Sequence, residues 1–281
     1  MFRLNTCILL VFLVFQSVGF SQERLLYKQI DSVNLFMDVY RPENFNYSKK
    51  YPAMIFFFGG GWSKGSIGQF EPHAKFFSRR GLVCFLVDYR VSKKYNTTPI
   101  ESLKDAKSAI RFIRERANIF QIDSSKIIAV GGSAGGHLAA ASALISGFNE
   151  SSDNLTISPA PNALVLMNPV IDNGPGGYGF DRIGNLYKNF SPLHNIVSGA
   201  PPTIIFLGTE DNLVPVETAK YYQKVMEKVG SRCELILYEG QKHGFFNYDR
   251  SFEHYKKTVL ATDNFLRSLG YLEIEPIIKI E

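Results

Sequence analysis

Hydrophobic and polar positions along the chain alternate in two ways. Patterns typical of strands occur at 33–40, 53–58, 82–87, 126–130, 163–167, 203–207 and 234–238. Between them, apolar residues recur at helical spacing over 72–80, 99–118, 134–146, 215–229 and 251–268. Continuous apolar strands that alternate with helices indicate an α/β fold, with a mostly parallel sheet covered by helices on both faces. In such sheets, functional loops gather at the carboxyl ends of the strands.

Residues 1–21 differ from the rest of the chain. Arg3 is followed by an unbroken apolar run over 7–15, and small residues then occupy positions 17, 19 and 21. This order is typical of a secretory signal peptide, and the run is far shorter than the ~20 residues of a membrane span. We therefore expect cleavage after residue 21, a single domain over 22–281, and a secreted or periplasmic protein without a stable membrane anchor.

The composition excludes several classes of protein. The 281 residues are 45% apolar and 20% charged, which is too apolar for a disordered chain. A formal charge of +5 is too small for a nucleic-acid-binding surface. Cys84 and Cys233, the cysteines beyond the signal, lie in apolar runs, which favours buried free thiols and leaves a disulfide open. No cluster of His, Cys, Asp or Glu has metal-ligand spacing.

The first chemical motif is a glycine-rich turn around Ser133. Residues 131–135 read Gly-Gly-Ser-Ala-Gly and join the strand at 126–130 to the helix at 134–146. This context is that of a nucleophile elbow, a tight, strained turn that exposes the serine hydroxyl above a helix N-terminus. A phosphate-binding turn is the alternative, but neither Gly-x-Gly-x-x-Gly nor a P-loop pattern is present. We predict that Ser133 is a nucleophile.

A second glycine cluster follows the strand at 53–58. Phe58, three glycines and Trp62 form a segment suited to an oxyanion hole, because glycines let backbone N–H groups approach a substrate closely. The expected donors are the N–H groups of Gly60, Gly61 and Ala134. In the related pattern His-Gly-Gly-Gly, the histidine braces the loop by a hydrogen bond. We expect Phe58 to brace it by packing, with an ordinary glycine-rich turn as the alternative.

An acid and a general base are expected after Ser133, in that chain order. Asp211 directly follows the strand at 203–207, and His243 lies between the strand at 234–238 and the last helix. In this arrangement His243 takes the proton of Ser133 and returns it to the leaving group, while Asp211 orients the imidazole. The competing residues are Glu210, Asp172 and Glu239 among the acids and His73, His137, His194 and His254 among the histidines.

These motifs resemble those of α/β-hydrolase-fold esterases, in the group around hormone-sensitive-lipase-like enzymes and bacterial carbohydrate esterases. The resemblance covers nearly all of 22–281. It is carried by residues 35–42 (Leu-Phe-Met-Asp-Val-Tyr-Arg-Pro), the glycine loop with Trp62, Asp88-Tyr-Arg90, Pro99 with Asp105, the Ser133 turn with His137, Asp211 with Pro215, and His243-Gly-Phe. It implies a Ser-His-Asp triad, no cofactor and hydrolysis of carboxylic esters. Phe58 in place of histidine is the departure from the pattern.

The size of the lid bears on the substrate. Little chain lies between residue 21 and the strand at 33–40, and the glycine-rich segment 170–200 is too short for a helical lid. An open site suits a small acyl group on a bulky polar alcohol, so we expect removal of acetyl, or feruloyl, groups from polysaccharide or oligosaccharide. Candidate substrate-binding residues are Trp62, Tyr178, Phe180 and Phe245, with ordinary packing as the alternative. The alternative functions are a general short-chain esterase or lipase, a serine peptidase, and a non-catalytic binding module. Serine peptidases of this fold usually carry a large second domain, for which residues 22–281 leave no room.

Overall fold

The computed structural model describes residues 22–280, so the predicted signal peptide at 1–21 lies outside the described residues. One sheet carries eight strands in the order β1-β2-β4-β3-β5-β6-β7-β8. The pairs β1–β2 and β2–β4 are antiparallel, and every pair from β4 to β8 is parallel. This is the mostly parallel α/β sheet that the sequence predicts.

The strands coincide closely with the predicted ones, with one addition. They are β1 (Gln22–Ile30), β2 (Val33–Tyr40), β3 (Tyr51–Phe57), β4 (Val83–Val87), β5 (Ile122–Gly132), β6 (Ala163–Met167), β7 (Thr203–Gly208) and β8 (Cys233–Tyr238). The added strand is β1, which forms a hairpin with β2 at the sheet edge. Its pairing shifts between Leu26 and Lys28. This bulge interrupts the alternation of apolar and polar residues by which a strand is recognised in sequence.

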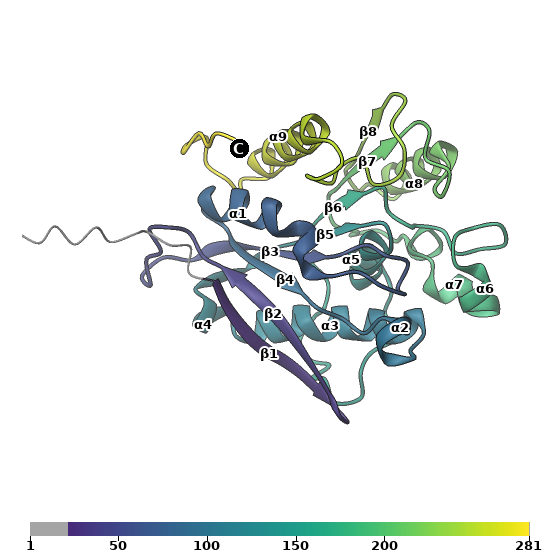
Figure 1. The fold of residues 1–281 in the computed structure, drawn as a ribbon, viewed down its shortest axis with the longest axis horizontal. Coiled ribbons are helices and arrows are strands. Elements are labelled where there is room, and N and C mark those ends of the chain that lie inside the picture. The colour runs from purple at the N-terminus through teal and green to yellow at the C-terminus, as the bar shows by residue number, and fades with distance from the viewer. Residues whose placement is uncertain (1–21, 281) are drawn as a thin grey trace, which may run out of the picture.

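Helices cover both faces of the sheet (Figure 1). The longer ones are α1 (Glu71–Arg79), α3 (Pro99–Glu115), α5 (Ala134–Leu144), α8 (Val216–Lys228) and α9 (Phe252–Ser268). Alternate residues of β3 enter two separate cores: Ile55 belongs to the core that includes residues of α3, α5 and α8, and Phe56 to the core that includes residues of α1 and α9. Both faces of the central strands are therefore buried, which explains their continuous apolar sequence.

The remaining helical segments are single turns. They are η1 (Ile67–Phe70), α2 (Ser92–Tyr95), α4 (Ala117–Phe120), α6 (Phe180–Ile183), η2 (Gly184–Leu186), α7 (Tyr187–Phe190) and η3 (Pro192–Asn195). Four of them lie in the segment 170–200, which contains no helix long enough to form a lid. The tail after Gly270 is an extension without strand pairing, and the Arg80 guanidinium donates to the carbonyl oxygens of Glu273 and Pro276 in it.

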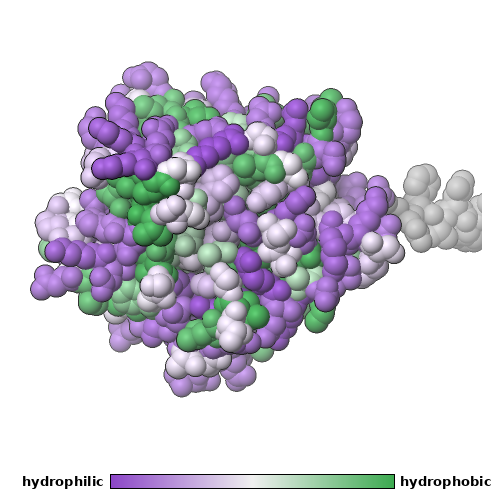
Figure 2. Space-filling view, turned by 180° about the vertical axis from the view of Figure 1, so that it is seen from behind, coloured by the Kyte–Doolittle hydropathy of each residue, from purple (hydrophilic) through white to green (hydrophobic). Residues whose placement is uncertain are grey.

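Both cysteines are buried free thiols, so the alternative of a disulfide does not hold. Cys84 lies in β4 and Cys233 in β8, far apart in the strand order. Burial raises the pKa of the Cys233 thiol to about 12 and also raises that of Cys84. Within residues 22–280, no helix has the length and apolar character needed to cross a membrane. The face in Figure 2 is mainly hydrophilic, with hydrophobic residues in separate patches.

Candidate active site

Ser133 lies in the turn between β5 and α5, at the carboxyl edge of the sheet. Its backbone has φ 54° and ψ −118°, a combination that is strained for a residue with a side chain and is typical of a nucleophile elbow. A Cβ added to Gly131 would overlap the carbonyl oxygen of Gly135, and one added to Gly135 would overlap that of Phe57. The turn therefore requires glycine at both positions, and it places Ser133 on a cavity wall.

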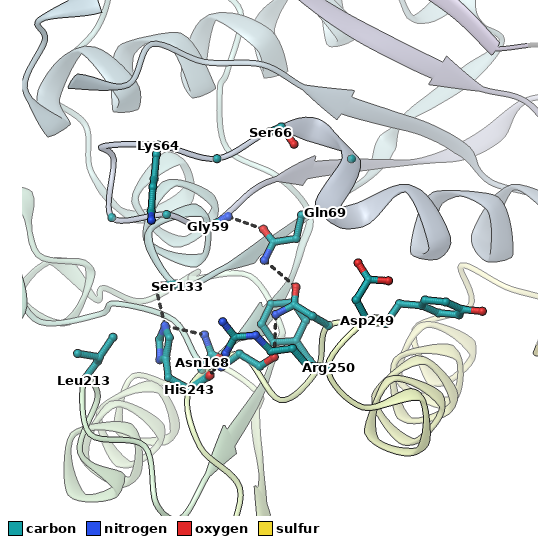
Figure 3. A pocket seen from close by; sticks show the side chains of 18 of the residues that line it. Gly59, Lys64, Ser66, Gln69, Ser133, Asn168, Leu213, His243, Asp249 and Arg250 are labelled. Carbon is teal, nitrogen blue, oxygen red and sulfur yellow. Dashed lines mark hydrogen bonds between the residues drawn. The ribbon is translucent and has the colours of Figure 1, made fainter. Parts of the chain in front are cut away.

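His243 and Asp211 reach Ser133 from the loops that follow β8 and β7. The Nε2 atom of His243 lies 2.8 Å from Ser133 Oγ (Figure 3). The Nδ1 atom lies 2.8 Å from Asp211 Oδ2. The other carboxylate oxygen of Asp211 accepts the backbone N–H groups of Leu213 and Val214. The Asp211 side chain is fully buried, whereas 19% of the His243 side chain is exposed. The structure thus joins the three predicted residues in one chain of hydrogen bonds.

The competing carboxylates have other surroundings. Glu210 and Glu239 are exposed. Asp172 Oδ1 accepts the backbone N–H of Gly174 at 2.8 Å and stabilises the turn that follows β6. Among these acids, Asp211 is the one hydrogen-bonded to the imidazole of His243.

The other histidines make contacts elsewhere in the fold and have no hydrogen bond to Ser133 among the described residues. His73 and His137 are buried, and burial lowers the pKa of each to about 3, so both are neutral near pH 7. His137 lies 2.9 Å from the carbonyl oxygen of Phe190 through Nε2. His254 Nδ1 lies 2.8 Å from the hydroxyl oxygen of Ser251, which caps the N-terminus of α9, and His194 Nδ1 lies 3.8 Å from Asp172 Oδ1. Within the described part of the chain, no three His, Cys, Asp or Glu side chains are placed to hold a metal ion.

The glycine loop after β3 is braced in two ways. The Phe58 ring stacks on Tyr89 with centroids 4.1 Å apart, and the Tyr89 hydroxyl donates to the Phe58 carbonyl at 2.6 Å. The packing role expected of Phe58 matches these contacts. The side chain of Gln69 adds a hydrogen bond that the sequence does not predict, because its Oε1 accepts the N–H of Gly59 at 2.6 Å.

The expected oxyanion-hole donors lie around Ser133. Gly60 and Gly61 line the cavity with φ of 128° and 63°, which glycine adopts without strain. Ala134 is the first residue of α5, so its N–H has no acceptor within the helix. The helix N-terminus also carries a partial positive charge that favours an anion. These groups therefore remain the candidates for holding a developing oxyanion.

Side-chain amides missed by the sequence reasoning connect the loops of the site (Figure 3). Asn168, which directly follows β6, places Nδ2 at 3.3 Å from His243 Nε2 and accepts the N–H of Gly244 at 2.8 Å. Gln69 donates to Asn247 Oδ1, and Asn247 donates to the Gly244 carbonyl, each at 2.7 Å. The position of Asn168 at a strand end was a usable signal. Gln69 and Asn247 are 178 residues apart and show no local pattern.

The cavity beside Ser133 has a volume of about 710 Å³. Its walls come from residues 59–61, from most of the segments 64–72 and 243–250, and from the single positions Ser133, Asn168, Tyr178 and Leu213. Tyr178 lines it, as expected. Trp62 and Phe245 are not part of the wall; Trp62 packs on His137, and Phe245 packs on Tyr238. Phe180 is also absent from the wall, and its ring contacts Tyr187 instead.

Comparison with known proteins places this chain among carboxylic ester hydrolases. Residues 37–175 match the family described as BD-FAE, and residues 174–271 match the dienelactone hydrolase family. The structure of apo Thermogutta terrifontis esterase 2 is similar with a TM-score of 0.87 and 41% identity, over 90% of this chain and 97% of that chain. The chain is an α/β-hydrolase serine esterase. Structures of the Thermogutta enzyme with propionate and with butyrate bound are similar to it at 40% identity.

Curated relatives of this esterase are more distant and longer. The acetylxylan esterase of Xylanibacter ruminicola is 26% identical over 230 residues, which is 75% of this chain and 44% of that protein. Esterase LipC of Mycobacterium tuberculosis is 27% identical over 250 residues, which is 80% of this chain and 60% of that protein. The chain therefore spans about half the length of these relatives. Carboxylic ester hydrolysis is common to them.

Proposed function

We propose that this esterase uses Ser133, His243 and Asp211 as a catalytic triad. The observation that carries the proposal is the unbroken chain of hydrogen bonds from Asp211 through His243 to the Ser133 hydroxyl, with 2.8 Å at both links. The burial of Asp211 and its two backbone donors fix the carboxylate, which in turn orients the imidazole. The strained elbow supports the assignment of Ser133 as the nucleophile.

The geometry supports a two-step acyl transfer. Ser133 Oγ attacks the ester carbonyl carbon while its proton passes to His243 Nε2, and the carbonyl oxygen becomes an oxyanion near the N–H groups of the glycine loop and Ala134. The imidazolium then protonates the alkoxy oxygen, the carbon–oxygen bond breaks, and the alcohol leaves. Water attacks the acyl-serine with His243 as base, which releases the carboxylic acid and restores the Ser133 hydroxyl.

The substrate we propose is a short acyl ester, foremost acetyl, of a polysaccharide or oligosaccharide. The segment 170–200 contains only single helical turns, so this segment forms no helical lid that could shelter a long acyl chain. Propionate and butyrate occupy structures of the similar Thermogutta esterase, and a curated relative is an acetylxylan esterase. These observations favour a small acid part and permit a bulky polar alcohol.

The test combines a substrate panel with matched serine variants. We expect hydrolysis of p-nitrophenyl esters to fall as the acyl chain lengthens beyond about eight carbons, and acetate release from acetylated xylan. Ser133→Ala should lower kcat by 10⁴-fold or more, within about the range found for triad serines. Ser198→Ala, at an exposed position of the segment 170–200, is the control and should keep full activity. Unchanged turnover by Ser133→Ala would remove Ser133 from the mechanism.

We also propose that the protein is exported and that residues 1–21 are removed as it leaves the cytoplasm. The apolar run at 7–15 and the small residues that follow it support this proposal. The N-terminal residue of the exported protein, determined by sequencing or intact mass, should be Gln22. An intact N-terminus on protein recovered from the medium or periplasm would contradict cleavage.

A further inference from the structure

A second cavity of about 410 Å³ lies next to the cavity beside Ser133. Both are lined by Gly68, Pro72, Tyr248 and Asp249, so they adjoin at these residues, and together they are called the groove. The groove leads from Ser133 toward α1 and the beginning of α9. In Figure 3, Asp249 lies well apart from Ser133 and His243, on the side away from Leu213.

We propose that this second cavity is a distal subsite for a further sugar ring of the substrate, bound while the acylated ring lies at Ser133. The name distal subsite denotes the part of the groove lined by Glu71, Lys75, Arg79, Tyr248 and Asp249. This inference rests on the proposed carbohydrate substrate and adds where a neighbouring unit of the chain binds.

The distal subsite lies on the alcohol side of the ester. In the proposed mechanism, His243 returns a proton to the alkoxy oxygen, so the departing alcohol lies next to this imidazole. Residues 244–250 directly follow His243, and all of them except Phe245 line the catalytic cavity, of which Tyr248 and Asp249 also line the distal subsite. A sugar chain that leaves the ester oxygen along this segment reaches Tyr248 and Asp249.

Tyr248 offers an aromatic surface at the junction. The residue is 36% exposed. Its ring meets those of Phe252 and Tyr255 at 76° and 79°, and these edge contacts fix its orientation. The C–H face of a pyranose is the apolar part of a sugar and packs well on such a ring, as other apolar groups do.

Charged groups around Tyr248 match the hydroxyl groups of a sugar. Glu71 and Lys75 form an ion pair at 2.7 Å. Asp249 and Arg79 have no ion-pair partner among the described residues, and Arg79 Nε is buried without a hydrogen bond. Two acidic and two basic side chains offer hydrogen-bond donors and acceptors. Their formal charges cancel, so the distal subsite has no net charge that would favour an anion or a cation. A fatty acyl chain would remove water from these charged groups without offering them hydrogen bonds, which is unfavourable.

The opposite side of the catalytic cavity differs in size and character. Behind Tyr178 and Leu213, which line both spaces, lies a cavity of only about 250 Å³. Val170, Ile171 and Pro215 contribute to its walls. The larger and more highly charged arm is therefore the one that leads to Tyr248, as expected if the alcohol part of the substrate is the bulky and polar part.

The experiment compares three substrates: p-nitrophenyl acetate, singly acetylated xylose and singly acetylated xylotriose. We expect the native esterase to show a kcat/KM on the trimer about tenfold above that on the monomer, because aromatic packing of one ring is worth roughly that factor. Tyr248→Ala should remove this preference through KM, so that the trimer-to-monomer ratio approaches one. Tyr248→Phe keeps the ring and should keep the ratio. Tyr221→Ala, a change at a 58% exposed tyrosine on α8, should change none of the three rates.

The outcomes separate this inference from the substrate proposal. Equal kcat/KM of the native enzyme on monomer and trimer would overturn the distal subsite and leave the deacetylase proposal standing. A trimer preference that Tyr248→Ala leaves intact would also overturn it. Cleavage of p-nitrophenyl acetate with no acetate release from either sugar would overturn the carbohydrate substrate, and the distal subsite with it.

Discussion

Two networks of charged side chains connect distant parts of this esterase, and they differ in where they end. The chain from Asp211 through His243 ends at the Ser133 hydroxyl on a cavity wall. The second network joins Lys28 of β1, Arg90, Asp105 of α3 and Glu150, each with a side chain at most 9% exposed. Asp105 accepts from Lys28 Nζ at 2.6 Å and from the Arg90 guanidinium and backbone at 2.8 to 2.9 Å.

The contrast shows that paired charges alone do not indicate chemistry. Burial alone would raise the pKa of Glu150, but the hydrogen bond and charge of Lys28 hold this pKa below its usual value. Lys28 and Arg90 are each paired with both Asp105 and Glu150, and none of these four residues lines the cavity beside Ser133. In the proposed triad, Asp211 is paired with one nitrogen of His243. The other nitrogen of His243 lies next to the Ser133 hydroxyl on the cavity wall, where it can take part in chemistry.

The largest effect that tests this contrast is expected from Asp211→Asn. The amide keeps the size of the side chain but favours the wrong imidazole tautomer, so kcat should fall about 10⁴-fold, as for the corresponding change in other triads. Thermal unfolding should change little. Glu210→Gln, at the adjacent exposed position, is the matched control and should retain activity. A larger loss in Glu210→Gln than in Asp211→Asn would show that the acid has been assigned to the wrong carboxylate.

The positions of the three residues of the proposed triad were predictable, because each of them lies in a local pattern. Ser133 lies in a Gly-x-Ser-x-Gly turn between a strand and a helix, and Asp211 and His243 directly follow the strands β7 and β8. Parallel strands bring their carboxyl ends to one edge, so the sequence order of strands is enough to place these residues together. The structure supplies the distances, which no sequence pattern contains.

The second network and the amide links were not predictable, because they depend on long-range pairing. Lys28 lies in a strand whose bulge hides its periodicity, and it reaches Glu150 across 122 residues of sequence. Which aromatic residues line the cavity was not predictable for a related reason. Phe246 lines the cavity and its neighbour Phe245 does not, since an irregular loop fixes no face for successive side chains.

Asp105→Ala should damage the fold and spare the chemistry. It leaves Lys28 and Arg90 buried with only Glu150 as a counter-charge, and removal of one partner from a buried ionic group costs about 3–5 kcal/mol of stability. The free energy of unfolding, measured with urea, should fall by this amount, while kcat per folded molecule stays within about twofold. Glu115→Gln, which removes an exposed ion pair with Arg116, should have a far smaller effect on stability. Loss of kcat in fully folded Asp105→Ala would remove the distinction between the two networks.

A smaller effect is expected where an uncharged link adjoins the site without touching the reacting atoms. Gln69 ties Gly59 of the glycine loop to Asn247 of the loop after His243, so it holds two sides of the cavity at a fixed spacing. Gln69→Ala removes both hydrogen bonds, and we expect kcat on p-nitrophenyl acetate to fall about tenfold, because a lost buried hydrogen bond costs about 1–3 kcal/mol.

The conservative variant Gln69→Glu separates the two links of this residue. The carboxylate still accepts the N–H of Gly59 but no longer donates to Asn247, so it should recover the part of kcat that depends on the glycine loop. KM for p-nitrophenyl acetate should change little in both variants, since the oxyanion donors act in the transition state rather than on bound substrate. Equal loss in both variants would assign the effect to the Asn247 link. A rise in KM with unchanged kcat would mean that Gln69 shapes the cavity and does not position the glycine loop.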